Sequence, residues 1–331
     1  MNQSPKLSIV ITTYNEGESI VSCVRSLVAQ NGAPEFEVIV VDDRSTDGSA
    51  AMLEALKIPT LTVIRLHRFE HGFLTSRQVA LDVGFRAARG EFIFVTDADA
   101  IVPRNWLAGL SDRRARTGAD AVGGPVRFVP APNGVNRLVA TMQTVDGAFY
   151  TGICALLNAV GCESGFVFGN CAFRREAYLK TGGYEAMGFG LTEDLVFSRA
   201  LRRNGGKLSF VAKPTVSVRA CGSWSILIRR ALRIGAGGVS ALSVLLGVWM
   251  PLWIALAIGL LASPGWFLGP FIIRHLLGAG FTAWWLARGG QWKLLPWSLV
   301  YEPAAIVTGL MVIWAGRKKN PVAWGGVDYD R

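Results

Sequence analysis

Cysteine and histidine are scarce in this chain of 331 residues, which contains five cysteines and three histidines. The cysteines are scattered, odd in number and without a C-x-x-C pair. This pattern predicts a reduced compartment and no disulfide framework. With so few histidines, the sequence also argues against a His-rich zinc site.

Two phosphate-binding signatures are missing as well. No G-x-G-x-x-G follows the first apolar run, and G-K-[ST] does not occur. The sequence therefore has neither the dinucleotide fingerprint nor a P-loop. The net charge of +10 comes without a recognition motif or a basic helical stripe, so we expect no nucleic-acid partner. An anionic membrane surface and a diphosphate ligand explain the charge better.

Charge is itself scarce in the C-terminal part. Residues 234–331 hold 7 of the 34 Lys and Arg and 3 of the 24 Asp and Glu, and none of these lies between residues 235 and 273. A membrane helix needs about 20 apolar residues, and the sequence predicts two or three spans. The alternative is a buried helical domain of a soluble protein. The candidate spans are 239–262, 266–287 and 294–316.

These differences in composition predict four parts. An N-terminal domain, 1–222, precedes an amphipathic interfacial segment, 223–238, then membrane helices, 239–316, and a basic polar tail, 317–331. No apolar leader precedes the first apolar run, so we expect the first domain to stay in the cytoplasm. The sequence leaves the number of spans and the side of the tail open.

Within residues 1–222, short apolar runs alternate with helix-like segments. This alternation, with short links, predicts an α/β domain with a central, mostly parallel sheet and helices on both faces. The strand-like runs are 7–11, 37–41, 61–64 and 91–95, and the helix-like segments are 18–30, 47–56 and 74–88.

Polar residues follow three of these runs. Asp97 and Asp99 come directly after 91–95, and similar polar stretches end the first two runs. Ligands of open α/β sheets bind at the carboxyl ends of the strands. Carboxylates there are hard oxygen ligands suited to Mg²⁺ or Mn²⁺ that bridges to a diphosphate. Alternatively, Asp97 caps the next helix.

Several ordered motifs give the chain a resemblance to a known family. Over about residues 6–215 it resembles the inverting family 2 glycosyltransferases with a GT-A-type domain. The resemblance implies a nucleotide-sugar donor, a divalent metal and inversion at the anomeric carbon. The motifs are TTYNE at 12–16, VVDDRSTDGS at 40–49, SRQVALDVG at 76–84, DAD at 97–99 and GGY…TEDLVFSRALRRNG at 182–205.

The matching positions carry implied roles. Asp99 would bind the metal, with Asp97 beside the ribose or the metal, Arg77 would lie near the diphosphate, and Asp194 would be the general base. Alternatively, Arg77 is a solvated helix charge, and Glu193 and Asp194 form the acidic first turn of a helix. The residues implied to hold the base and ribose are Thr13, Tyr14, Asn15, Glu16 and Asp43.

The segment before the first span, residues 224–234, combines apolar residues with cations and could lie in the bilayer interface. It resembles the Q-x-x-R-W element of membrane-bound family members, but Arg230 replaces the Gln and Ile234 the Trp. That departure weakens the analogy to processive synthases. Arg230, Arg233 and Glu193 are candidate contacts to the acceptor or diphosphate, and a plain cationic anchor is the alternative for the segment.

Taken together, the sequence predicts a metal-dependent inverting glycosyltransferase, of hexosyltransferase type, in the cell envelope. It would transfer a single sugar from a nucleotide-diphosphate sugar to a lipid or envelope-glycan acceptor. We expect a multi-pass protein of the cell membrane with its catalytic domain in the cytoplasm. The alternatives are a processive polysaccharide synthase and an inactive nucleotide-sugar-binding membrane scaffold.

Overall fold

The computed structural model describes residues 6–68, 72–130, 137–162, 164–235, 241–317, 322–324 and 326–329. The chain divides into two compact units. The first unit comprises residues 1–126, 165–219 and 320–331, and the second comprises 127–164 and 220–319.

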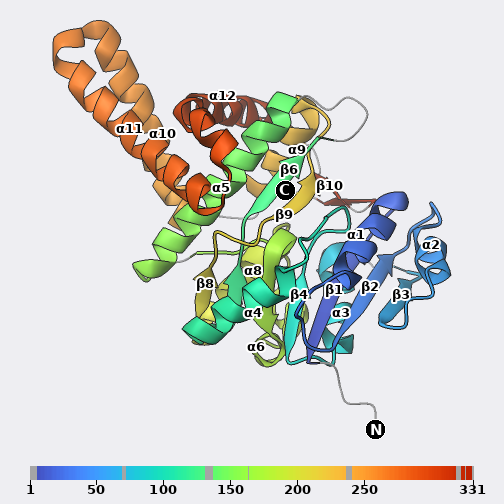
Figure 1. Cartoon of the computed structure of the whole chain (residues 1–331). Coiled ribbons are helices and arrows are strands. Elements are labelled where there is room, and N and C mark those ends of the chain that lie inside the picture. Colours follow the sequence, from blue (N-terminus) through green and yellow to red (C-terminus); the bar gives the residue numbers. More distant parts are fainter. Residues whose placement is uncertain are drawn as a thin grey trace. The chain divides into compact units, whose positions relative to one another are not determined.

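A seven-stranded sheet forms the centre of the first unit, in the order β3-β2-β1-β4-β7-β5-β8 (Figure 1). The strands from β3 to β4 are parallel, β7 is antiparallel to both of its neighbours, and β5 pairs parallel with β8. The mostly parallel sheet predicted from the sequence is confirmed. The strands are β1 Leu7–Thr13, β2 Phe36–Asp43, β3 Leu61–Leu66, β4 Phe92–Val95, β5 Ala121–Gly123, β7 Cys171–Arg174 and β8 Leu208–Phe210.

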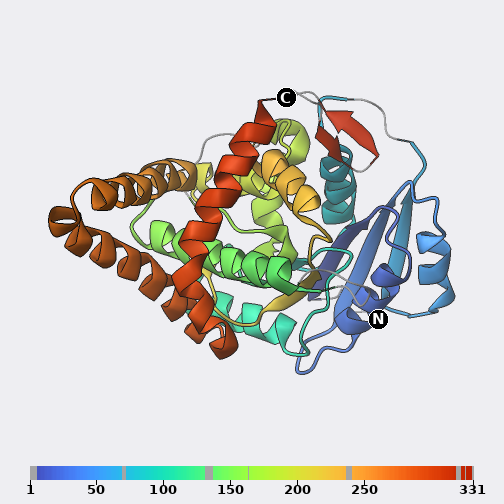
Figure 2. The same ribbon diagram turned by 90° about the horizontal axis from the view of Figure 1, so that it is seen from above.

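Helices cover both faces of this sheet. The right-handed rule for parallel crossovers places α1 (Glu18–Val28) and α2 (Ser49–Ala55) on one face and α3 (Ser76–Ala87) on the other, because the chain reverses direction across the sheet after β3. Figures 1 and 2 show α1 and α3 on opposite sides of the strands. Strands that are covered on both faces have nearly continuous runs of apolar residues in their sequence, and β1 and β2 follow this pattern.

Close packing of α3 on the sheet depends on one glycine. A Cβ at Gly84 would lie 2.5 Å from Val10 Cγ1 and 3.1 Å from Val41 Cγ2. A larger residue would therefore push α3 away from β1 and β2. This matters because the N-terminal end of α3 carries Arg77.

The remaining helices of the first unit pack around an aromatic core. The ring centroids of Phe173 and Phe197 are 4.7 Å apart, and those of Phe85 and Tyr178 are 4.9 Å apart. These rings join α3, β7, α6 and α8. The elements are α4 Trp106–Thr117, the 3₁₀ turn η1 Phe168–Asn170, α6 Arg175–Lys180, α7 Gly183–Met187, α8 Glu193–Arg203, β9 Val216–Arg219, β10 Val322–Trp324 and β11 Val327–Tyr329.

The second unit is mostly helical among its described residues. The chain passes into it within β6 (Val126–Val129). The ring of Phe149 in α5 packs on Phe281 of α11 and Tyr301 of α12, at centroid distances of 6.0 and 5.1 Å. The helices are α5 Arg137–Ala159, α9 Trp224–Gly235, α10 Ala241–Ala262, α11 Pro264–Arg288, η2 Trp292–Trp297 and α12 Ser298–Gly316.

Charged residues inside the apolar helices have partners. Arg274 in α11 forms an ion pair with Glu302 in α12, and both are buried. Trp249 of α10 donates from Nε1 to Glu302 at 2.8 Å, and Arg274 Nη2 donates to the Trp249 carbonyl at 2.7 Å. Burying these charges is costly unless they are paired and hydrogen-bonded, so the network ties the three helices together.

The two units differ from the predicted boundaries in two places. Residues 127–164, predicted to lie in the N-terminal domain, belong to the second unit because α5 buries its apolar side chains there. The predicted polar tail contributes β10 and β11 to the first unit, while residues 318–321 and 330–331 of that tail lie outside the described residues.

One helical stretch among the described residues, Trp292–Ala315, is long and apolar enough to cross a membrane. It coincides with the third predicted span. Val248–Ala262, within the first predicted span, is apolar but shorter. The two or three predicted spans therefore correspond to one stretch of sufficient length and apolarity.

The buried carboxylate of Glu37 on β2 joins this strand to β1 and to the segment between α3 and β4. Glu37 accepts hydrogen bonds from Ser8 Oγ at 2.7 Å, from the Arg89 backbone N–H at 2.7 Å and from Arg89 Nη2 at 2.7 Å. Burial alone would raise the pKa of Glu37. The hydrogen bonds from Ser8 and Arg89 lower it by a larger amount, so the pKa of Glu37 is below the ordinary value.

Glu37→Gln should lower the free energy of unfolding by about 1–2 kcal/mol at pH 7, because charge-assisted hydrogen bonds are lost. A depressed folded-state pKa contributes stability above the unfolded value of about 4.3, and that stability is lost as pH falls through the folded-state pKa. The difference between variant and wild type should therefore shrink below about pH 4. Urea unfolding followed by circular dichroism at about pH 7 and below about pH 4 measures this difference in the free energy of unfolding.

Glu54→Gln, which removes an exposed pair with Arg65, is the matched control. An equal loss of stability in both variants would contradict the prediction.

Candidate active site

The carboxyl ends of three parallel strands meet at one edge of the sheet. In the register, Thr13 of β1 lies beside Asp42 of β2, and Val10 lies beside Val95 of β4. The polar stretches that follow these strands are therefore neighbours. Thr13 Oγ1 and Asp42 Oδ1 are buried and have no hydrogen-bond partner among the described residues. Buried polar atoms normally have partners, so these two atoms are candidate ligand contacts.

Hydrogen bonds fix the loops after β1 and β2 to each other. The Asn15 backbone N–H donates to Ser45 Oγ at 2.9 Å, and the Thr46 N–H donates to Asn15 Oδ1 at 2.8 Å. The Gly17 N–H donates to Asp47 Oδ2 at 2.8 Å. Asn15 thus uses its side-chain oxygen to position the neighbouring loop. Its predicted contact with the donor stays a prediction.

Asp43 is buried and held by the residue that follows it. Arg44 donates from Nε to Asp43 Oδ1 at 2.7 Å and from Nη2 to Oδ2 at 3.1 Å. Its guanidinium carbon lies 5.8 Å from the centroid of the Tyr14 ring. Two predicted donor contacts, Tyr14 and Asp43, are therefore joined by Arg44. The sequence analysis assigned Arg44 no role, although it lies inside the quoted VVDDRSTDGS motif.

Arg77 connects two motifs that are far apart in the sequence. It forms ion pairs from Nη2 to Asp97 Oδ1 at 2.8 Å and from Nε to Glu193 Oε1 at 2.7 Å. Burial lowers the pKa of Arg77, but Glu193 and Asp97 raise it, and the net pKa is above the ordinary value. Arg77 is therefore a fixed cation between the end of β4 and the start of α8. The alternative of a solvated helix charge is wrong.

Asp194 lies in the first turn of α8, next to Glu193. Its Oδ1 accepts a hydrogen bond from the Leu195 N–H at 2.8 Å, and its side chain is half-buried. Burial raises the pKa of the Cys171 thiol, and Asp194 and Asp97 raise it further. Cys171 opens β7 and pairs with Val95. The TED and DAD motifs lie close together, because Arg77 pairs with both Asp97 and Glu193, the neighbour of Asp194.

Glu16 brings a third carboxylate near the DAD motif. Burial raises its pKa to about 7, Asp99 and Asp97 raise it as well, and Arg219 and Arg77 act in the opposite direction. Arg219 also donates a hydrogen bond to Ser19 at the start of α1. Arg219 could not be identified as a site residue from the sequence, because it lies in no recognised motif.

This concentration of negative charge suits a divalent cation. Among the described residues, no group of three or more His, Cys, Asp or Glu side chains is arranged to hold a metal ion. Mg²⁺ is usually held by one or two carboxylates together with substrate phosphates. The half-buried Asp97 and Asp99 therefore fit an ion that binds together with a diphosphate.

The loop before Asp194 is held by α3. Thr75 and Gln78 form a capping box at the start of α3, and the buried Gln78 side chain also reaches the loop. Gln78 Nε2 donates to the Gly188 carbonyl at 2.8 Å, and the Gly190 N–H donates to Gln78 Oε1 at 3.2 Å. Gln78 is a positioning residue that the sequence analysis did not identify.

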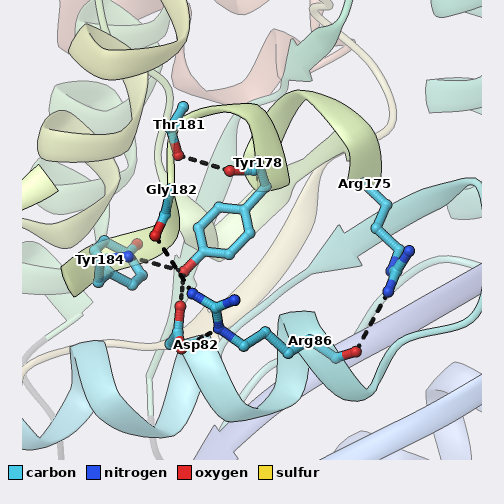
Figure 3. A network of polar contacts seen from close by, with 7 residues as sticks. All are labelled: Asp82, Arg86, Arg175, Tyr178, Thr181, Gly182 and Tyr184. Atoms are coloured by element: carbon cyan, nitrogen blue, oxygen red, sulfur yellow. Dashed lines mark hydrogen bonds and ion pairs between the residues drawn. The ribbon is translucent and has the colours of Figure 1, made fainter. Parts of the chain in front are cut away.

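A second network joins α3 to the segment that leads to α8 (Figure 3). Tyr178 Oη donates to Asp82 Oδ1 at 2.5 Å, and Arg86 Nε donates to Asp82 Oδ2 at 2.6 Å. The Tyr184 N–H donates to Tyr178 Oη at 3.2 Å, and Tyr184 Oη donates to the Glu193 carbonyl at 3.1 Å. Helix α3, which carries Arg77, thus positions the start of α8, which carries the Arg77 partner Glu193.

Two predicted site residues belong to the second unit. Arg230 and Arg233 lie on α9, and the Arg230 guanidinium carbon is 4.9 Å from the centroid of the Phe128 ring. Their contact with acceptor or diphosphate stays a prediction.

Known proteins resemble this chain in sequence. Residues 8–182 match the model of glycosyl transferase family 2. The chain is 33% identical over 119 residues to the glycosyltransferase GlyG of Streptococcus pneumoniae, a match that covers 36% of this chain and 38% of that protein. It is 27% identical over 246 residues to the succinoglycan biosynthesis protein ExoM of Rhizobium meliloti, covering 71% and 74%. The chain thus spans well under half of GlyG.

A solved structure shares the fold. The mannosyltransferase PcManGT from Pyrobaculum calidifontis, in complex with GDP-Man and Mn²⁺, has a TM-score of 0.53 and 22% identity, with 95% of this chain and 88% of that chain covered. The family model matches more than half of the chain, including the strand ends that meet at the candidate site. The chain belongs to glycosyl transferase family 2.

Proposed function

We propose that the protein is a metal-dependent, inverting glycosyltransferase that transfers one hexose from a nucleotide-diphosphate sugar to a lipid or envelope-glycan acceptor at the membrane. The observation that carries the proposal is the double ion pair of Arg77, which joins Asp97 and Glu193. These ion pairs bring Asp97 of the DAD motif close to the first turn of α8, where Asp194 lies, and this closeness supports the proposal.

We assign the residues at the strand ends two roles, which are contact with the nucleotide and binding of the metal ion. Thr13, Tyr14 and Asp43 contact the base and ribose, and Asp99 with Asp97 holds Mg²⁺ or Mn²⁺. When bound, the ion stabilises the negative charge that develops on the departing diphosphate. Arg77 adds a fixed positive charge beside it.

Asp194 acts on the acceptor. It takes the proton from the acceptor hydroxyl as that oxygen bonds to the anomeric carbon and the bond to the diphosphate oxygen breaks. One displacement without a protein nucleophile inverts the configuration. Asp194 is half-buried and lies in the first turn of α8.

The second unit supports a membrane-bound acceptor. Large apolar side chains are widely exposed on its helices, including Leu261 at 87%, Trp266 at 83% and Trp314 at 70%. Apolar surface of this extent marks an interaction site. The buried Arg274–Glu302 pair suits helices that lie in lipid, where intramembrane charges face one another. We propose that α10, α11 and α12 hold the enzyme in the cell membrane with the first unit in the cytoplasm.

The printed names of two relatives fit an envelope role. ExoM and ExoO of Rhizobium meliloti are both succinoglycan biosynthesis proteins. The proposed acceptor class, a lipid or an envelope glycan, rests on these names and on the apolar surface of the second unit.

Asp194→Asn should lower turnover by about 10²–10⁴-fold, because the variant keeps the shape of the side chain and loses the general base. Donor affinity should stay close to the wild-type value, since Asp194 acts on the acceptor. Initial rates and a donor titration, measured on the same preparation, separate the two effects.

Two controls sharpen this test. Asp112→Asn, on the exposed face of α4, should leave turnover unchanged. Glu193→Gln should mainly weaken donor binding, because it releases Arg77. Near-normal turnover of Asp194→Asn would show that another group is the base.

Asp99→Asn should remove most metal-dependent nucleotide binding while the fold survives, because a neutral amide is a much weaker ligand for a divalent ion than a carboxylate. Electron paramagnetic resonance of Mn²⁺, titrated with protein and UDP or GDP, should show less bound ion than in wild type. Asp112→Asn is again the matched control. Full activity of wild type in excess chelator would overturn the metal assignment.

The full chain should sediment with membranes after an alkaline carbonate wash and be released by detergent. Ile258→Asp, which places a charge on an exposed position of α10, should lower recovery in a liposome-flotation assay. Leu179→Asp, an exposed apolar position of the first unit, should not. Recovery of the wild-type chain in the soluble fraction without detergent would contradict the membrane assignment.

A further inference from the structure

The end of the chain forms a hairpin on the first unit. In β10 and β11, Val322 pairs with Tyr329 and Trp324 with Val327, antiparallel. Val327 and Tyr329 are each 8% exposed, while Asp328 between them is exposed. Alternating burial is the pattern of a strand with one face packed on a core. The hairpin is therefore an integral part of the first unit.

The buried face of β11 contacts the region around Arg77. Tyr329 Oη accepts a hydrogen bond from the Ser76 N–H at 2.8 Å. Ser76 opens α3, and the first N–H groups of a helix have no partner within the helix. The Tyr329 ring lies 6.0 Å from that of Phe189, and Tyr329 and Val327 share an apolar cluster with Leu191. Phe189 and Leu191 lie in the loop that leads to Asp194.

The turn of the hairpin contacts the loop after β1. Gly326 has a φ of +73°, and a Cβ there would collide with the Tyr14 hydroxyl. The hydrogen bond from Arg44 to Asp43 raises the pKa of Arg44, and Tyr14 and Tyr329 contribute in the same direction. The hairpin thus lies against Tyr14 and close to the cation that holds Asp43.

These contacts connect the two ends of the donor site. We propose that the hairpin of β10 and β11 is a wall of the site that binds a nucleoside diphosphate, with Tyr329 positioning the start of α3 beside Arg77 and Gly326 positioning Tyr14. This inference rests on the proposed function, because it takes Tyr14 and Arg77 as donor contacts. It adds that the site is incomplete without the hairpin of β10 and β11.

The test uses the full-length protein in detergent with Mn²⁺. UDP, GDP, dTDP and ADP are titrated by calorimetry to find which one wild type binds. Tyr329→Phe keeps the ring and removes the acceptor of the Ser76 N–H, so affinity for that nucleotide should fall about fivefold. Gly326→Ala should weaken binding by about tenfold or more, since it displaces Tyr14 and strains the turn.

The exposed Asp328 provides the matched control on the same strand. Asp328→Asn should bind the nucleotide as wild type does. In Tyr329→Phe, the donor KM should rise while kcat stays within about twofold, and the melting temperature should stay within about 2 °C. A merely structural role of Tyr329 would lower the melting temperature without this split between KM and kcat.

The outcomes separate this inference from the proposed function. If wild type binds none of the four nucleotides, both are overturned. If wild type binds one and Tyr329→Phe binds it equally well, the hairpin is not part of the site, whatever Gly326→Ala does. Tighter binding by Tyr329→Phe would mean that the hairpin obstructs the site, which also overturns the inference.

Discussion

The active site depends on the guanidinium of Arg77, which bonds Asp97 and Glu193 at the same time. Removing one member of a buried ion pair costs about 3–5 kcal/mol, because the partner is left charged and unpaired. Arg77 therefore does more than neutralise charge. Its two ion pairs hold the end of β4 close to the start of α8, the helix that carries Asp194.

Three features of the surrounding structure position the helix that carries Arg77. Gly84 lets α3 lie close to β1 and β2, the capping box with Gln78 fixes its first turn, and the Asp82 network anchors its middle to the segment before α8. Each of these interactions would contribute little stabilising free energy if it were exposed to water. In a buried network they support one another, because each group is held in place before the next bond forms.

Much of the sheet, and the gathering of polar residues at one of its edges, could be predicted from the sequence. Continuous apolar runs such as 37–41 are typical of strands covered on both faces, and polar residues at their ends predict a site at one edge. The pairing of Arg77 with Glu193 could not be predicted, since no local pattern shows which carboxylate a helix cation will meet 116 positions later. Arg219 and Gln78 were missed for the same reason: their roles depend on tertiary contacts. The grouping of α5 with the later helices could not be predicted either, because it depends on contacts such as those of Phe149 with Phe281 and Tyr301.

The hydrogen bond between Ser76 and Tyr329 joins positions 253 residues apart. The first unit is built from three separate stretches of chain, the last of which begins at residue 320. During synthesis from the N-terminus, the sheet can form long before that stretch has left the ribosome. The proposed contact of β10 and β11 with the donor site can therefore form only after the helices of the second unit have been made, because those helices precede β10 in the chain.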